Sequence, residues 1–307
     1  MRIYRYLLVL ILIVTFGAGF QNKCDGSKKD KKDQPDRPQA SQTAEAVPSI
    51  PAASPLPEKS GDVKTLAEGS NGKMDSPFVL VARTAETYGD LQKMVEGLPS
   101  ASALDFKKTA VIAAFAGEKP TGGYSVEITG SAGKYAAGVK SPPPDAMVTE
   151  ALTMPFRVVA VPVEEEDSLD IDLSENWTGA MRSYRVTSGE IVYSGGLGGG
   201  TTRFEPKGTI RVLVSGEHIS MFFDLDGKAG NVARTLNEAA SGRLKDGKIE
   251  LPRVEAAGFI EGPHPPLVVS GTFSEEKIAL TFDPGKRDYV VNDGYSGGGK
   301  LSAEKVD

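Results

Sequence analysis

Short apolar runs that alternate with polar residues dominate the chain from Ser183 onward, and almost every run ends in a turn. Residues 241–251 and 270–280 repeat one pattern: a strand, a tight turn and a second strand with its apolar side chains on one face. Alternation with a period of two is typical of half-buried strands, and many short strands at turn spacing indicate a sandwich or a barrel. We therefore expect residues 164–307 to form an all-β sandwich or meander barrel.

Residues 76–163 combine strands with a helix. Residues 78–82 and 110–115 are apolar on both faces, which is expected of strands covered on both sides. Other expected elements are a helix that starts after Thr84, a hairpin over residues 124–139 and a strand over residues 156–163. The predicted fold class is therefore α+β or mainly β, with a small sheet-plus-helix module ahead of the β-rich domain.

The N-terminus has features of an export signal. Arg2 and Arg5 precede the apolar run Leu7 to Phe20, whose 14 residues are few for a transmembrane helix of about 20. Residues 1–24 are therefore expected to be a signal peptide or an uncleaved anchor. Cys24 follows the run, as in a bacterial lipoprotein, and lipidation at Cys24 or cleavage upstream of it are both open.

Residues 25–75 have few aromatic or β-branched residues. They begin with a Lys- and Asp-rich stretch, residues 28–33, and continue through several prolines. Such a segment buries too little apolar surface to offset a chain entropy of about 1–2 kcal/mol per residue. It is expected to be a disordered linker that tethers the folded modules in the periplasm, at the outer membrane or on the cell surface of a bacterium.

Composition and motifs exclude several kinds of chemistry. The formal net charge of -6 argues against a nucleic-acid binder, and one cysteine excludes disulfide frameworks and thiolate-rich metal sites. Neither His218 nor His264 lies near a Gly-x-Ser-x-Gly elbow in the sequence. We expect no cofactor, no metal and no enzymatic activity.

The first module resembles the PrcB C-terminal domain, a family named after a lipoprotein subunit of a bacterial surface protease complex. The resemblance lies in Ala110 to Phe115, in Lys119 to Val126, in Pro144 and in Thr149 to Phe156. It implies a role in binding or stabilising another protein of a complex, and it does not imply catalysis. The expected partner is another envelope or secreted protein, with a protease among the candidates.

The expected partner-binding residues form the tight loop of Lys119, Pro120, Thr121, Gly122, Gly123 and Tyr124. Proline fixes φ and the paired glycines permit positive φ, so the loop is expected to be stiff and exposed. The same loop is similar to the glycine-containing loop of chagasin-type cysteine protease inhibitors. That similarity implies an alternative function, inhibition of a protease through residues 119–124.

The second domain allows another alternative, a lipocalin-like carrier of an apolar ligand. Residues 176–179, Asn-Trp-Thr-Gly, would suit the opening strand of such a barrel. Residues 229–240 could form a helix beside it, because Val232, Leu236 and Ala240 are spaced by four residues.

Overall fold

The structure is a computed structural model that describes residues 63–164, 167–194, 201–255, 266–284 and 296–306. The predicted signal peptide, Cys24 and residues 25–62 of the predicted linker lie outside the described residues. None of the helices among the described residues is long and apolar enough to cross a membrane. The described chain is mostly β, with a small sheet-plus-helix module and an eight-stranded barrel, which confirms the predicted fold class.

The first module contains an antiparallel four-stranded sheet in the order β1-β6-β3-β2. Its strands are β1 (Lys64–Gly69), β2 (Phe78–Ala82), β3 (Thr109–Phe115) and β6 (Phe156–Pro162). Every residue of β2 is buried, as expected from a run that is apolar on both faces. Helix α1 (Ala85–Met94) starts where predicted, because the Thr84 hydroxyl accepts a hydrogen bond from the Thr87 N–H. A short 3-10 helix, η1 (Ala101–Ala103), follows.

A second sheet of three strands completes this module. The predicted hairpin is formed by β4 (Ser125–Ser131) and β5 (Lys134–Lys140), and β7 (Asp170–Leu173) adds to β5 in parallel. The short helix α2 (Glu175–Thr178) follows and places Trp177 in the module's core. The Trp177 indole N–H donates a hydrogen bond of 2.9 Å to the carbonyl of Phe115 on β3.

The first module therefore extends beyond the predicted range 76–163 at both ends. Strand β1 lies within the range expected to be a linker, and it pairs with β6. Strand β7 and helix α2 were expected in the second domain, and residues 176–179 do not open the barrel. Both segments are short and polar for their length, so periodicity alone did not reveal them.

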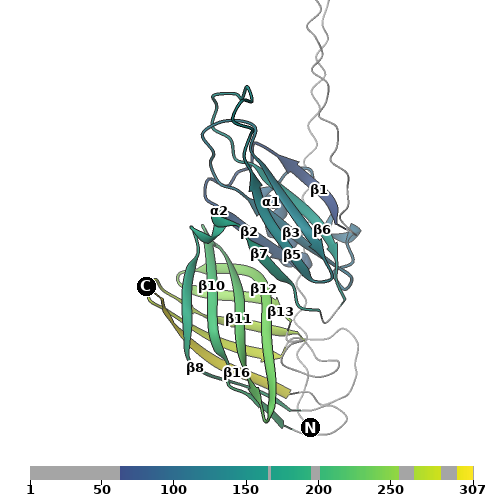
Figure 1. The fold of residues 1–307 in the computed structure, drawn as a ribbon. Helices are drawn as coiled ribbons and strands as arrows, with labels where there is room; N and C mark the ends of the chain where they lie inside the picture. Colours follow the sequence, from purple (N-terminus) through teal and green to yellow (C-terminus); the bar gives the residue numbers. More distant parts are fainter. Residues whose placement is uncertain (1–62, 165–166, 195–200, 256–265, 285–295, 307) are drawn as a thin grey trace, which may run out of the picture. The chain divides into compact units, whose positions relative to one another are not determined.

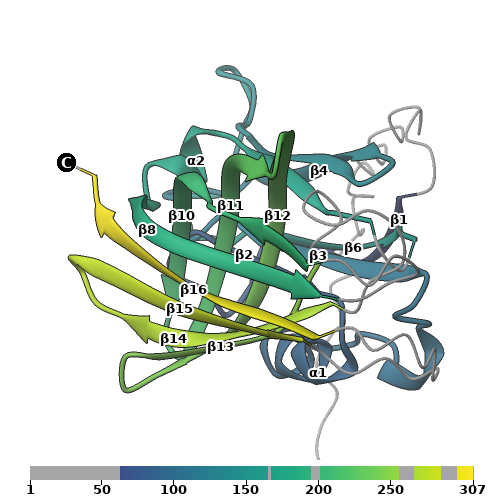
Figure 2. The same ribbon diagram turned by 90° about the horizontal axis from the view of Figure 1, so that it is seen from below.

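The second module is a closed barrel, in which each long strand pairs antiparallel with the next (Figures 1 and 2). Strand β8 pairs with both β10 and β16, so eight strands form a ring and the sandwich alternative is wrong. The short strand β9 pairs with β8 and β11. The strands are β8 (Arg182–Ser194), β9 (Thr201–Phe204), β10 (Lys207–Ser215), β11 (His218–Ala229), β12 (Val232–Lys245), β13 (Lys248–Val254), β14 (Leu267–Phe273), β15 (Lys277–Pro284) and β16 (Ser296–Lys305).

The predicted helix over residues 229–240 is wrong, because these residues belong to the β11–β12 hairpin. Leu236 pairs with Leu225, and Ala240 pairs with Met221. A spacing of four residues is also an even number, so it places side chains on one face of a strand as well as on one face of a helix. The periodicity was therefore ambiguous, and pairing with β11 decided the structure.

The two repeated strand–turn–strand stretches are the hairpins β12–β13 and β14–β15. Each has a glycine at its second position, Gly242 and Gly271. A Cβ atom there would lie 2.0 Å from the Glu250 carbonyl oxygen or 2.1 Å from the Ala279 carbonyl oxygen. Only glycine permits the neighbouring strands of this narrow barrel to approach so closely.

The outer surface of the barrel covers the free edge of β2. The Ser220 hydroxyl donates to the Val79 carbonyl, and the Ser241 hydroxyl accepts from the Val81 N–H at 2.8 Å. Leu213 from β10 also joins the buried cluster of the first module. Both modules belong to the compact unit Pro55–Asp307. The barrel side chains thus cover the edge of β2, which would otherwise be open to pairing with another strand.

Candidate functional site

The loop predicted to bind a partner connects β3 to β4 and is held against the segment that precedes β6. Lys119 and Thr153 exchange backbone hydrogen bonds of 2.7 and 3.0 Å. The Gly122 N–H donates to the Thr149 carbonyl at 2.9 Å, and the Thr153 hydroxyl donates to the Thr121 carbonyl at 2.8 Å. These bonds fix the loop at Lys119, Thr121 and Gly122, so its predicted stiffness has a structural basis.

The glycine pair has distinct roles in this loop. Gly122 is buried, and a Cβ atom there would lie 2.4 Å from the Thr149 hydroxyl oxygen. Gly123 has a φ of +83°, and its Cβ would lie 2.9 Å from Pro142 and 3.0 Å from Val148. Gly122 therefore allows close packing, while Gly123 allows the left-handed backbone that turns the chain into β4.

The side chains of the loop are only partly available to a partner. Pro120 and Gly123 are exposed, whereas Thr121 and Tyr124 are half-buried. The Lys119 ammonium donates a hydrogen bond to the Asn176 side-chain oxygen, and burial lowers the pKa of Lys119. Lys119 thus holds α2 against the loop. The exposed part of the loop is therefore limited to Pro120 and Gly123.

The segment that clamps the loop carries exposed apolar side chains that the sequence analysis did not single out. Met147 is fully exposed, and Leu152 is 63% exposed. Both lie between the prolines 142–144 and β6, in a stretch without regular secondary structure. An isolated methionine in a proline- and threonine-rich loop was the only signal, and local pattern alone does not distinguish exposed from buried apolar residues in a loop.

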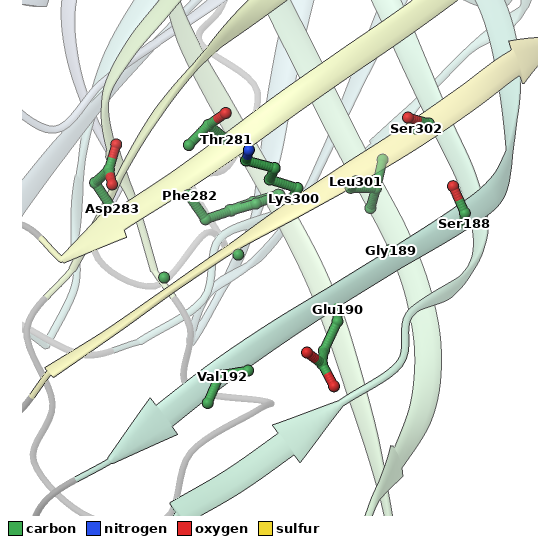
Figure 3. A pocket seen from close by; sticks show the side chains of 12 residues that line it. Ser188, Gly189, Glu190, Val192, Thr281, Phe282, Asp283, Lys300, Leu301 and Ser302 are labelled. Carbon is green, nitrogen blue, oxygen red and sulfur yellow. The ribbon is translucent and has the colours of Figure 1, made fainter.

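A carrier would need an apolar cavity, and the barrel interior holds packed side chains instead. The inward residues form one buried cluster, whose largest members include Tyr184, Tyr193, Phe204, Met221, Phe223 and Phe282. A groove of about 540 Å³ is lined by β8, β15 and β16 (Figure 3). Its polar residues, such as Ser188, Glu190 and Lys300, alternate with buried Ile191 and Leu301. This groove therefore lies on the outer face of the barrel.

The described residues offer little for metal or histidine chemistry. Within them, no group of three or more His, Cys, Asp or Glu side chains is placed to hold a metal ion. His218 is half-buried on β11, and burial is the main cause that lowers its pKa, while the nearby Asp90 carboxylate opposes that shift. His264 and the glycine-rich residues 195–200 lie outside the described residues.

The fold and the clamped loop define a small α+β module joined to a β-barrel, with Pro120 and Gly123 of the loop exposed. Residues 110–162 match the family described as PrcB C-terminal, inside the range where the sequence resembled it. The match includes β3 to β6, the loop of residues 119–124 and the segment that clamps it. Searches of curated proteins and of solved structures each found no match.

Proposed function

We propose that this protein is an exported, membrane-tethered binding protein that associates with another protein of the bacterial envelope. The family match supports a subunit associated with a protease complex. The proposed role is to bind or stabilise the partner, without catalysis by this chain.

The observation that carries the proposal is the preorganised loop of residues 119–124. Four hydrogen bonds hold it against residues 149–153, and its apex at Pro120 and Gly123 faces outward. A loop that is already ordered loses little conformational entropy when it binds, so more of the contact energy contributes to affinity.

Export and tethering are supported by the N-terminal pattern of arginines, an apolar run and Cys24. Cell fractionation tests this part directly. The full chain should be recovered with envelope membranes, and Cys24→Ser should release it if a lipid on Cys24 is the anchor. Recovery of the wild-type chain in the cytoplasm would contradict export.

The partner-binding role is tested by affinity purification of the full chain from native envelopes, with two alanine variants. Gly123→Ala forces an L-residue into positive φ and into contact with Pro142, so it should displace the loop and reduce partner recovery severalfold. Gly138→Ala is the matched control, because Gly138 lies on strand β5 and nothing lies within 4 Å of a Cβ atom added there. Equal recovery with both variants, when both are folded, would assign the binding to another surface.

The inhibitor alternative has no added support in the geometry. An inhibitory loop must enter a protease cleft, whereas Gly122 is covered by Thr149 and Lys119 is held by Asn176. The full chain is therefore expected to leave cysteine and serine proteases active at micromolar concentration. Inhibition that Gly123→Ala abolishes would establish the alternative instead.

A further inference from the structure

The strongest unexplained surface feature is the segment of residues 142–153, which we call the clamp segment. Among the described residues, the exposed large apolar side chains are Met147, Leu152, Val232 and Val268. Two of these four lie on the clamp segment, and Met147 is the most exposed. Single apolar residues scattered over a surface need no explanation, and two on one short segment make that segment the candidate for a contact.

The clamp segment is held in place by its own contacts. A turn closes it, since the Ala146 N–H donates to the Pro143 carbonyl at 3.0 Å. Val148 is half-buried and packs beside Gly123, and the Thr149 carbonyl accepts the Gly122 N–H. The residues on either side of Met147 are therefore fixed, while Met147 itself points to solvent. A flexible, polarizable side chain on a fixed backbone suits an anchor in a partner's pocket.

Charges around the clamp segment favour a protein over a membrane as the occupant. Asp145 and Glu150 flank Met147 and are exposed, and Glu118 is exposed on the adjoining loop. Two cations on adjoining segments have partners of their own, since Lys119 is bonded to Asn176 and Lys140 lies 3.6 Å from Glu127. Anionic membrane surfaces attract segments rich in Lys and Arg, so an acidic apolar tip is poorly suited to them.

We infer that Met147 and Leu152 are the anchors that enter an apolar pocket with a basic rim on the partner protein. The inference rests on the proposed function and adds the residues that carry the affinity and the chemistry of the complementary surface. Lys119 to Tyr124 then act mainly by positioning the clamp segment.

The first experiment places a photo-crosslinking amino acid in the full chain within native envelopes, at position 147 or, as control, at position 232. Val232 is an exposed apolar residue of the barrel, so it matches Met147 in class. One protein adduct is expected from position 147 and none from position 232. Equal labelling from both positions, or adducts only to lipid from position 147, would overturn the inference.

The second experiment measures binding of the crosslinked protein, once purified, to full-chain variants. Met147→Asp should weaken binding at least tenfold, Met147→Leu should retain it, and Val232→Asp should leave it unchanged. Asp145→Lys should also weaken binding, because it opposes a basic rim, and the effect of this charge change should shrink at high salt.

The outcomes separate the inference from the proposed function. Binding that survives Met147→Asp but is lost in Gly123→Ala would overturn the anchors and leave the loop as the contact. Binding by the wild-type chain to no envelope protein would overturn both. Binding of the wild-type chain to phosphatidylethanolamine–phosphatidylglycerol vesicles, lost in Met147→Asp, would replace the protein partner with a lipid surface.

Discussion

Arg83 Nη1 lies 3.5 Å from Glu238 Oε1, and both side chains are buried between the first module and the barrel. Glu238 also accepts a 2.7 Å hydrogen bond from the Leu169 N–H, and Glu255 Oε1 lies 4.0 Å from Arg83 Nη2. Burying a charged pair is costly, so this contact is weak evidence of a net gain in stability. The arrangement ties β2, β7 and β12 to one relative position.

The free energy of unfolding should fall as pH rises from about 5 to 8. Burial is the main cause that raises the pKa of Glu238 to about 8, while the Arg83 charge opposes the shift. In this range the folded state binds a proton that the unfolded state releases, so each unit of pH removes up to about 1.4 kcal/mol of stability. Denaturant titration at several pH values measures the slope.

The control for this slope is an isosteric change at the same site. Glu238→Gln keeps an acceptor for the Leu169 N–H and removes the titration, so its stability should depend less on pH than that of the wild type. Glu217→Gln, at an exposed position, should retain the wild-type slope. Equal slopes for all three proteins would show that Glu238 does not titrate in this range.

Ser241→Ala should destabilise the protein by about 1–3 kcal/mol, because it leaves the Val81 N–H buried without its acceptor. The Ser220 and Ser241 hydroxyl oxygens lie 2.7 Å apart, so the double variant should cost less than the sum of the single variants. Urea denaturation measures these differences. Ser131→Ala, at an exposed position on β4, is the control, and a loss as large as that of Ser241→Ala would refute the edge-capping role.

Unfolding followed by tryptophan fluorescence and by far-UV circular dichroism should give one coincident transition. Trp177 is the only tryptophan and is buried in the first module, while most strand residues belong to the barrel. Because Leu213 and Phe222 of the barrel join the first module's core, neither module should unfold alone. Two separated midpoints would show that the modules are independent.

Gly89→Ala should stabilise the protein by about 0.5–1 kcal/mol. Gly89 lies within α1, nothing lies within 4 Å of an added Cβ, and alanine loses less backbone entropy on forming a helix. Gly242→Ala adds the same methyl group within 2.0 Å of a carbonyl oxygen and should destabilise instead. Thermal melts compare the two, and a lower midpoint for Gly89→Ala would contradict the reason given.

Local sequence determined the elements whose signals are short-ranged. The apolar runs of β2 and β3, the Thr84 cap of α1 and the glycine turns of the hairpins follow from periodicity and backbone preference. The family match likewise covers residues 110–162, which are contiguous in the chain and lie in one module. The loop of residues 119–124 was found because its proline and glycines constrain φ.

Only the tertiary structure decided the features that join distant segments. Closure of the barrel through β8 and β16, addition of β7 to β5 and burial of Glu238 each depend on residues far apart in the chain. Periodicity specifies which face of a strand is apolar, but it does not specify which strand or charge will cover that face. The exposure of Met147 could not be predicted for the same reason, because a loop residue is buried or exposed according to what packs against it.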